Sequence, residues 1–548
     1  MVSFRFAMKQ LRKYWGRTVL ALICSLIGAI GFVVASLLLT ELLNSLIEGS
    51  FDRFWVISLL DILSWFVVVG AGYFGELLSE SAVQSAIEDI RLDILNQMST
   101  LNYESFHNKQ SLNYSTALLT DLKVVEERTL QKFFGLADSI MMLIASSAAL
   151  VYLHYSLLLT VIVLLIVMMV IPNFFSEQMS QAAENVATSE EEMASQAGHW
   201  IGGFDTLNDF NKKSLIVNNV RQFVDSVKTN KIKDTKIQAI VGAVMGVMST
   251  LSQLSTVFVS GYLSLLNIVP IGSVLSTGNL AGMVFQQVQS LSTQVAQFRS
   301  SEKVVDKLQQ SSLAIEGQPI NETKDTSIGE DRRFTLATNG LSYTFPGGNV
   351  LHYPDMTLAG DKNIAIAGDS GVGKSVFFNI LIRDYQNYSG SIQLNGVELL
   401  NIPEREIKDI IGHVRQKTYI FNKSLKDNIT LCDDTISAER LQRAIDKSGL
   451  RGLVNRLSAK EDTIIGEKAV KLSGGQEQRI SIARALIHDY PIILFDEVTA
   501  NLDRTTAQAI EQEISHIDNG LKISVSHHLN AENEALYDEV IMFDRSNT

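Results

Sequence analysis

The chain has 548 residues and a mass of 60.6 kDa, which is enough for several domains. A hydrophobic fraction of 46% and a mean hydropathy of +0.15 indicate a membrane-embedded part, and the apolar residues are concentrated before about residue 300. The net charge of −13 and the pI of 5.3 argue against a nucleic-acid partner, which would favour a basic surface. The two cysteines, Cys24 and Cys432, are too few for a disulfide framework or a metal cluster.

Apolar segments predict six membrane-spanning helices, because a span needs about 20 mostly apolar residues. The predicted spans are residues 18–47, 54–74, 133–152, 156–175, 237–266 and 274–295. The first follows a basic stretch and is longer than the roughly 7–15 residues of a signal-peptide core. We therefore expect it to be retained as a membrane helix.

Two long polar connections, residues 76–132 and 177–236, follow the second and fourth spans. Basic residues gather before the first span and along the second connection, which places both in the cytoplasm by the positive-inside rule. Neither connection contains a proline, so both can be helical over long stretches. We expect two helical arms that extend from the membrane, with a tight turn at His154 and Tyr155 on the opposite side.

One face of the sixth span is polar. Gln286, Ser290, Thr293 and Gln297 recur there at helical spacing. They could line a polar pathway, or they could join neighbouring helices by hydrogen bonds, as polar residues commonly do in membranes. The sequence leaves both interpretations open.

A glycine-rich segment, GDSGVGKS at residues 368–375, matches the pattern G-x-x-x-x-G-K-[ST] of a phosphate-binding loop. An apolar strand precedes it and a helical apolar pattern follows it, which is the context that such a loop requires. Its glycines let backbone N–H groups approach phosphates, Lys374 neutralises their charge, and the Ser375 hydroxyl can reach Mg²⁺.

Two acidic residues end the apolar strand of the segment PIILFDEVTANLD, residues 491–503. Acidic residues in such a place are often only helix caps. Together with a phosphate loop, however, they indicate catalysis: Asp496 would hold Mg²⁺ directly or through water, and Glu497 would polarise the attacking water.

Five motifs stand in an order that is similar to that of the nucleotide-binding domain of ATP-binding cassette (ABC) transporters. They are GDSGVGKS, HVRQKTYIFNKSLKDNI, IIGEKAVKLSGGQEQRISIARAL, IILFDEVTANLD and ISVSHHL. The resemblance covers residues 334–544, and LSGGQ between the two nucleotide motifs makes it specific. Six spans with two arms ahead of one such domain resemble an exporter-type half-transporter. This resemblance implies coupling helices at the arm tips, near Phe106 and Phe204.

The resemblance also implies roles for residues at matching positions. Gln416 would sense Mg²⁺ and contact the membrane domain, His527 would hold the γ-phosphate, and Asp503 would communicate across a dimer. Phe345 would stack on adenine where the family usually has tyrosine, with Tyr343 as the weaker candidate. The residues expected to surround the phosphates are Gly368, Asp369, Ser370, Gly371, Val372, Gly373, Lys374, Ser375 and Val376.

A second glycine loop contains Ser473, Gly474, Gly475 and Gln476 and opens a helix, whose N-terminal N–H groups and dipole favour an anion. The phosphate loop surrounds only part of a nucleotide, so a second surface must close the site. In the family this loop caps the ATP held by the opposite subunit. We therefore expect two ATP molecules between two chains.

The sequence thus predicts three parts: an all-α six-helix transmembrane domain with two cytoplasmic arms (1–305), a linker (306–333), and an α/β P-loop ATPase domain with a helical subdomain (334–548). We expect an ATPase with ATP and Mg²⁺ as cofactors. It would pair with a second half-transporter chain, as a homodimer or heterodimer, in a bacterial cell membrane with the ATPase domain in the cytoplasm.

The expected activity is outward movement of a drug, peptide or lipid-like solute by alternating access. Two alternatives remain. One is an exporter-shaped importer of a siderophore or haem-type chelate. The other is an ATP-driven membrane sensor or regulator that transports nothing.

Overall fold

The computed structural model describes residues 2–101, 103–108, 117–316, 334–345, 347–369, 371–466, 468–500, 502, 504–517, 520–525 and 534–544. The chain divides into two compact units. The first unit comprises Met1–Ser99 and Ser111–Ile315, and the second comprises Thr100–Gln110 and Glu316–Thr548. The segment 100–110, in the first predicted connection, therefore belongs with the second unit.

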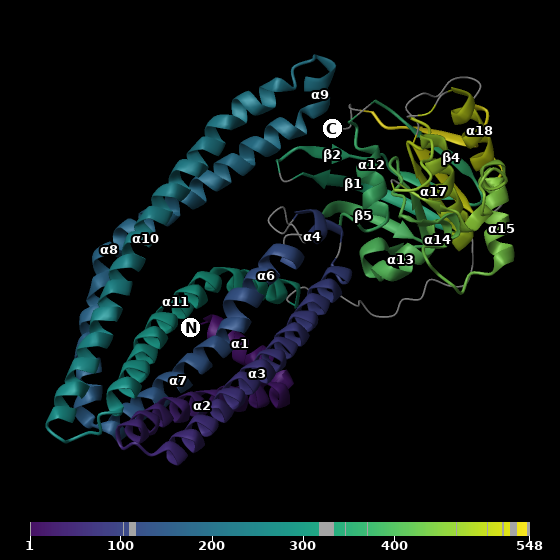
Figure 1. Cartoon of the computed structure of the whole chain (residues 1–548). Helices are drawn as coiled ribbons and strands as arrows, with labels where there is room; N and C mark the ends of the chain where they lie inside the picture. The colour runs from purple at the N-terminus through teal and green to yellow at the C-terminus, as the bar shows by residue number, and fades with distance from the viewer. Residues whose placement is uncertain are drawn as a thin grey trace. The chain divides into compact units, whose positions relative to one another are not determined.

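Long helices build the first unit (Figure 1). They are α2 (Trp15–Ile47), α3 (Phe51–Ser99), α7 (Gln131–Leu153), α8 (Tyr155–Gly202), α10 (Ser214–Leu265) and α11 (Ser273–Glu316). Each of the six predicted spans lies in one of them, except that the last residue of the fifth, Leu266, follows the end of its helix. Because α7 ends at Leu153 and α8 begins at Tyr155, the expected tight turn between the third and fourth spans is confirmed. The α11 helix continues through the start of the predicted linker to Glu316.

Length and hydropathy together mark four helical stretches among the described residues as able to cross a membrane. They are Val2–Ile47, Phe51–Ser99, Ala117–Leu153 and Ser214–Leu265. The described apolar part of α8, Tyr155–Met168, is shorter. The sixth predicted span is helical but falls outside this set, since serines, threonines and glutamines interrupt its apolar residues.

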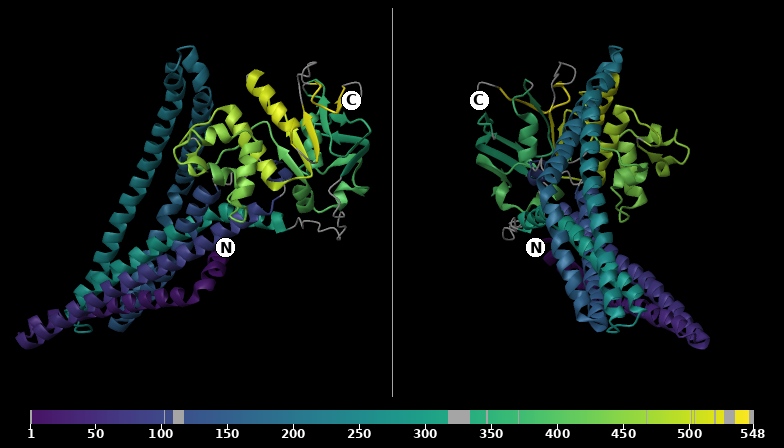
Figure 2. Two further views of the ribbon diagram at one scale, coloured as in Figure 1. Left: turned by 90° about the vertical axis from the view of Figure 1, so that its right-hand side faces the viewer. Right: turned by 60° about the vertical axis from the view of Figure 1, so that its left-hand side comes forward.

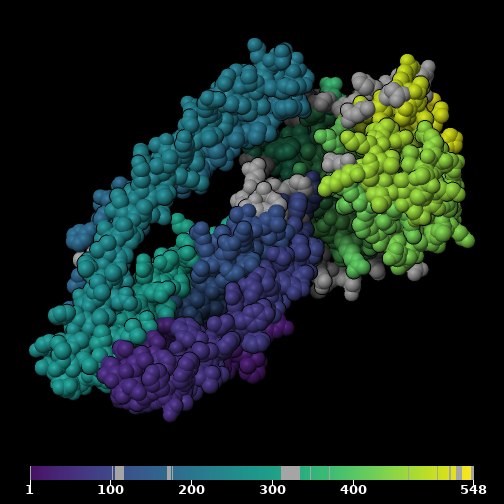
Figure 3. Space-filling model, viewed as in Figure 1, coloured from purple at the N-terminus to yellow at the C-terminus, as the bar shows by residue number. Residues whose placement is uncertain are grey.

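The two connections extend the spans as helices, as the absence of proline predicted. The α3 helix continues to Ser99 and is followed by the short α4 (Tyr103–Asn108). The α8 and α10 helices lie side by side, and α9 (Phe204–Asp209) joins them at their far end (Figures 1 and 2). In the space-filling view this pair stands apart from the other helices of the first unit along much of its length (Figure 3). Both tips thus carry a short helix where the family resemblance places coupling helices.

Small residues let the first two long helices pack closely. A Cβ atom at Gly31 would meet the Val68 side chain at 2.8 Å, and one at Gly75 would lie 3.2 Å from Cys24 Cβ. Farther along, α1 (Val2–Leu11), α6 (Leu122–Val125), α7 and α11 bury an apolar cluster against α3. Burial of this cluster stabilises the unit by removing apolar surface from water.

The polar face of the sixth span makes some of the helix-to-helix hydrogen bonds that one interpretation predicted. Ser139 on α7 donates to Ser290 on α11 at 3.4 Å, and Gln294 donates to both hydroxyls. Thr293, in contrast, bonds to its own helix, and Gln286 is exposed. Hydrogen bonding between helices therefore accounts for Ser290. The other interpretation, a polar pathway, stays open for the exposed Gln286.

Two β-sheets form the frame of the second unit. Four strands of the antiparallel sheet run in the order β2-β1-β5-β6, with β3 paired to β1, and the parallel sheet has the order β12-β4-β11-β10-β7. Their bounds are β1 (Thr335–Thr344), β2 (Val350–His352), β3 (Met356–Ala359), β5 (Tyr388–Leu394) and β6 (Val397–Glu398), then β4 (Asn363–Ala367), β7 (Ile411–Val414), β10 (Ile492–Asp496), β11 (Leu521–Val525) and β12 (Glu539–Met542). The parallel strands β4 and β11 are buried along their full length, as expected for a sheet covered on both faces.

Helices and a small two-stranded antiparallel sheet complete the second unit. They are α12 (Lys374–Leu381), α13 (Glu404–Ile410), α14 (Leu425–Thr430), α15 (Ala438–Lys447), α16 (Arg451–Val454), α17 (Gly474–His488) and α18 (Arg504–Ser515), with β8 (Lys423–Ser424) paired to β9 (Ile464–Ile465). The helices α14 to α17 share a separate apolar core, which is the expected helical subdomain. The fold class predicted from the sequence is therefore confirmed for both units.

Candidate functional site

The phosphate loop lies between the buried strand β4 and helix α12. Gly368 has a φ of +151° and Gly373 a φ of +93°, values that L side chains rarely adopt. A Cβ atom at Gly368 would also collide with the backbone oxygen of Phe543. These positions require glycine, so the loop is shaped by its sequence to let backbone N–H groups face an anion.

The Lys374 side chain folds back over this loop. Its Nζ atom donates to the backbone oxygens of Gly368 and Asp369 at 2.7 and 2.9 Å. Burial lowers the pKa of the Lys374 ammonium, and nearby carboxylates, Glu497 first among them, oppose that shift. A buried ammonium beside backbone N–H groups is well suited to phosphate oxygens, because an anion would offset the cost of its burial.

Oxygen ligands suitable for a divalent cation gather at the end of β10. The Ser375 hydroxyl donates to Asp496 Oδ1 at 3.0 Å. Burial raises the pKa of the Asp496 carboxyl; the Ser375 hydrogen bond opposes this shift, and the neighbouring Glu497 carboxylate adds to it. The Ser375 hydroxyl and the carboxylates of Asp496 and Glu497 fit Mg²⁺, because this ion prefers oxygen ligands. Its charge would also offset the repulsion between the two carboxylates.

Glu497 is held in an uncommon backbone conformation. Its φ is +49°, in the left-handed region, and its carbonyl accepts from Ala500 N in a tight turn. Gln416, just after β7, donates from Nε2 to Glu497 Oε2 at 2.9 Å. The structure therefore brings the predicted water-polarising carboxylate and the predicted sensor glutamine into direct contact, although they lie 81 positions apart.

The second glycine loop forms a complete helix cap. Ser473 is the N-cap of α17: its hydroxyl accepts from Gln476 N at 3.4 Å, while the Gln476 side chain accepts from Ser473 N at 3.0 Å. A Cβ atom at the buried Gly475 would press on Thr506, whereas Gly474 is exposed. The exposed helix start presents N–H groups to any anion outside the chain.

A cavity of about 310 Å³ connects this loop with the catalytic candidates. Its lining includes Gly474, Gln416 and Glu497, together with Val498 and Leu502, and all the described lining residues lie outside the phosphate loop. Within one chain, the second glycine loop thus opens beside Glu497 rather than over the chain's own phosphate loop.

The two aromatic candidates for adenine differ in accessibility. Tyr343 is 7% exposed, and its ring stacks on Tyr385 with centroids 5.2 Å apart. Phe345 is half-buried and touches the edge of Tyr343, with centroids 5.2 Å apart. Because Tyr343 is buried in the core and Phe345 is only half-buried, the geometry favours Phe345 as the more accessible of the two aromatics.

A set of contacts joins α4, the short helix near Phe106, to the segment that carries the predicted sensor Gln416. Arg415 lies over the Tyr103 ring at 5.0 Å and donates to the Tyr103 hydroxyl at 3.3 Å. The same guanidinium pairs with the buried carboxylate of Asp384 at 2.6 Å, and Tyr103 also contacts the ring of Tyr385. Sequence reasoning missed these residues, although Arg415 immediately precedes the predicted sensor Gln416.

The remaining predicted site residues lie either outside the described part of the chain or within and beside the phosphate loop. Ser370, Asp503 and His527 lie outside the described residues. Val372 is buried in the core, and Val376 is half-buried and packs against it. Gly371 has a φ of +86°, in keeping with the shape of the loop.

Comparison with protein families gives two matches along the chain. The model described as "ABC transporter transmembrane region" matches residues 18–288, and the model described as "ABC transporter" matches residues 351–500. Together they span most of the sequence. The first match covers most of the first unit and also the segment 100–110, and the second match lies within the second unit.

Similar proteins include transporters of several kinds. An ATP-dependent lipid A-core flippase of Desulfotalea psychrophila is 23% identical over 525 residues, which is 92% of this chain and 88% of that protein. A β-(1→2)glucan export ATP-binding/permease protein of Rhizobium johnstonii is 26% identical, covering 63% of this chain and 58% of that protein. The human mitochondrial iron-sulfur clusters transporter is 26% identical, with shares of 62% and 46%.

A solved structure shares the fold of the whole chain. It is a bacterial Atm1-family ABC exporter with ATP bound, and it aligns with a TM-score of 0.79 and 19% identity over 96% of this chain and 93% of that one. One transmembrane region fused to one ATPase domain is half of such a transporter, which pairs with a second chain in the membrane. The chain belongs to the ABC transporter family, as a multi-pass membrane protein that couples ATP hydrolysis to transport.

Proposed function

We propose that this chain is one half of an exporter that hydrolyses ATP at sites shared between two chains. The observation that carries the proposal is the contact between α4 and the ATPase unit. Tyr103 from the tip of the first arm packs on Arg415, and the next residue, Gln416, bonds to Glu497. A motion of the arm would therefore reach the catalytic carboxylate through two consecutive residues.

Each predicted site residue has a proposed task in this scheme. Phe345 stacks on adenine, the loop 368–376 surrounds the phosphates, and Lys374 pairs with their negative charge. Glu497 polarises the attacking water, and Gln416 keeps its carboxylate oriented. Outside the described residues, His527 would hold the γ-phosphate and Asp503 would communicate with the partner.

Three residues are proposed to hold Mg²⁺: Ser375, Asp496 and Gln416. The metal, when bound, would neutralise charge on the phosphates during transfer. The chain contributes the Ser375 hydroxyl and the Asp496 carboxylate in hydrogen-bonding contact, so both oxygens are already placed before the metal binds.

The trans cap explains why one domain carries two glycine loops. Gly474 opens beside Glu497 in one chain rather than over its own phosphate loop. We infer that residues Ser473 to Gln476 close on the nucleotide held by the partner, which is a second copy of this chain or a related half-transporter.

Export from the cytoplasm of a bacterial cell is the proposed direction and location. Relatives named for glucan export and lipid flipping, and a neighbouring structure described as an exporter, support the direction. Basic residues before the first span and along the second arm support a cytoplasmic ATPase domain.

The test is vectorial transport in sealed vesicles containing the purified chain with its ATPase domain outside. We expect ATP-dependent accumulation of a drug, peptide or lipid-like solute in the lumen, and no accumulation with Glu497→Gln. ATP-driven loss of a preloaded solute would indicate an importer instead. A solute that stimulates ATP hydrolysis without moving would indicate a regulator.

A further inference from the structure

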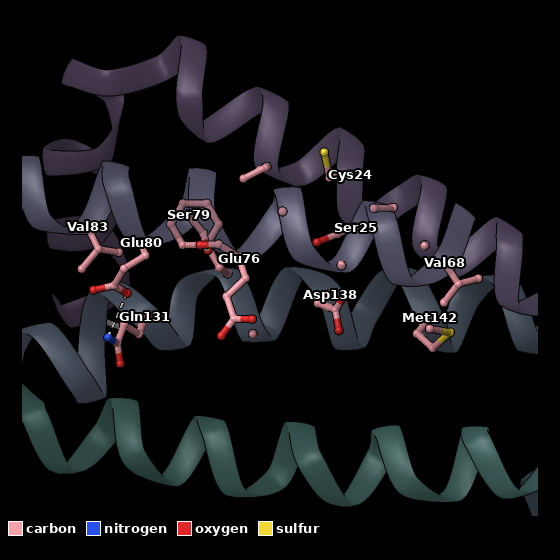
Figure 4. Close-up of a pocket in the computed structure, with 17 residues that line it drawn as sticks. Cys24, Ser25, Val68, Glu76, Ser79, Glu80, Val83, Gln131, Asp138 and Met142 are labelled. Atoms are coloured by element: carbon pink, nitrogen blue, oxygen red, sulfur yellow. Dashed lines mark hydrogen bonds between the residues drawn. The ribbon is translucent and has the colours of Figure 1, made fainter. Parts of the chain in front are cut away.

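A cavity of about 620 Å³ lies within the first unit, among α2, α3 and α7 (Figure 4). Small residues from the three helices create its space: Ala21, Gly28, Ala71, Gly72, Gly75 and Gly135. Val68, Val83, Phe134 and Met142 add apolar side chains to the wall, and Ser25, Ser79 and Gln131 add neutral polar ones. This volume is within the range of about 300–1,000 Å³ that is typical of small-molecule sites.

Three carboxylates line this cavity: Glu76, Glu80 and Asp138. Its described lining contains no lysine, arginine or histidine. In Figure 4 the carboxylates of Glu76 and Asp138 point to the same side of α3 and α7. The cavity therefore concentrates negative charge next to apolar walls.

The partners of Glu80 are neutral. Its two carboxylate oxygens accept from the side-chain amides of Gln84 at 2.7 Å and Gln131 at 3.2 Å. Two basic residues near the cavity contact α3 farther along that helix. Arg17 on α2 donates to Ser81 and Ser85, and Lys13, just before α2, pairs with Asp89. Among the described residues that line the cavity, the carboxylates thus have no cationic partner. A bound cation would stabilise these carboxylates strongly, because they lie next to the apolar interior of the membrane.

We propose that this cavity is a binding site for an organic cation with an apolar body, which is the substrate class of the proposed exporter. Among the described residues, no group of three His, Cys, Asp or Glu side chains is arranged to hold a metal ion. The carboxylates are spread along the wall, which suits a bulky ligand that buries apolar groups and places its positive charge between them.

The position of the cavity agrees with loading from the ATPase side. Glu76 and Glu80 follow the cytoplasmic end of the second predicted span, residues 54–74, and Asp138 lies early in the third. A cation attracted by these carboxylates would enter from the cytoplasm. This inference about substrate class rests on the proposed export function, whereas binding itself can be measured separately.

The test uses two ions of similar shape and opposite charge, tetraphenylphosphonium and tetraphenylborate. Equilibrium dialysis with the purified full-length protein in detergent measures their binding without requiring transport. We expect the cation to bind at least ~10-fold more tightly than the anion. The attraction between one positive charge and one carboxylate, at an effective dielectric constant of about 20, is sufficient for that ratio.

Three variants locate the binding. The combined change Glu76→Gln, Glu80→Gln and Asp138→Asn should weaken cation binding at least ~10-fold. Gly72→Leu should also weaken it without changing charge, since a Cβ atom at Gly72 has open space within 4 Å and a larger side chain would occupy the cavity. Glu88→Gln, an exposed carboxylate on α3 outside the lining, should leave binding unchanged.

Equal binding of the two ions, or unchanged cation binding in both the triple variant and Gly72→Leu, would overturn the inference. Should the triple variant fail to fold, Gly72→Leu decides alone. Export of some other solute without cation binding would refute the substrate class and keep the exporter. Cation binding at this site without movement of any solute would support the site and refute the exporter.

Discussion

Phe345 and Tyr343 provide the sharpest test of the adenine assignment, because they share one strand end and differ in what surrounds them. Phe345 is half-buried, so Phe345→Ala should remove base stacking with little loss of stability. A stacking loss of about 1 kcal/mol corresponds to a roughly fivefold rise in the Kd for ATP. The rate at saturating ATP should stay near that of the unchanged protein, because adenine lies far from the reacting phosphate.

Tyr343→Ala should give the opposite pattern. Its ring is 7% exposed and packs between Tyr385 and Phe345, so truncation leaves a cavity in the core. Loss of a large buried aromatic costs about 3 kcal/mol, which lowers the melting temperature of a domain of this size by roughly 6–12 °C. The Kd for ATP of the folded fraction should change little.

The assay is fluorescence titration with a ribose-labelled ATP analogue on the full-length protein, beside thermal melting of the same samples. Phe345→Tyr serves as the matched control, because it keeps a stacking face, and it should bind as the unchanged protein does. A fivefold loss of affinity in Tyr343→Ala at unchanged melting temperature, with Phe345→Ala normal, would refute the assignment.

Three further predictions concern the chemistry. Glu497→Gln should bind ATP normally but hydrolyse it at least ~10²-fold more slowly, and near-normal turnover would exclude Glu497 as the base. Mixed dimers should combine one chain with Lys374→Ala and one with Ser473→Arg. They should recover ATPase activity that neither variant shows alone, because one intact phosphate loop then faces one intact cap. Verified mixed dimers without recovery would count against the trans cap. Burial raises the pKa of the Asp496 carboxyl above its ordinary value of 3.8. Between 3.8 and this raised pKa, the nucleotide-free folded protein binds more protons than the unfolded chain. The folded protein therefore loses stability as the pH rises through that range. Asp496→Asn should flatten this part of a melting-temperature profile, and an unchanged profile would contradict the raised pKa.

Local motifs made the phosphate loop and the acidic strand end predictable. Gly368 and Gly373 are required by the backbone itself, since both have positive φ values, and the apolar strand before Asp496 determines where its carboxylate emerges. Such features depend on neighbours in sequence, so a pattern of residue types is sufficient to find them.

Contacts between distant segments were not predictable in the same way. Tyr103 and Arg415 are 312 positions apart. The family resemblance pointed to their neighbours, Phe106 and Gln416, but not to this pair. The sequence already ranked Phe345 ahead of Tyr343 as the adenine candidate. The stacking of Tyr385 on Tyr343, which agrees with that ranking, could not be predicted. The sixth span was predicted from the sequence, but the hydrogen bond that joins Ser139 on α7 to Ser290 on α11 could not be, because it depends on how the two helices pack.

Arg415 and Gln416 are joined by a single peptide bond, and this has a thermodynamic consequence. Arg415 contacts Tyr103 in α4, and Gln416 contacts the carboxylate that we propose polarises the attacking water. In the proposed exporter, the free energies of binding at the two ends are therefore linked. If ATP changes the affinity for a solute tenfold, or about 1.4 kcal/mol, that solute must change the affinity for ATP by the same factor. Nucleotide titration can therefore identify ligands of the membrane domain before any assay of their movement exists.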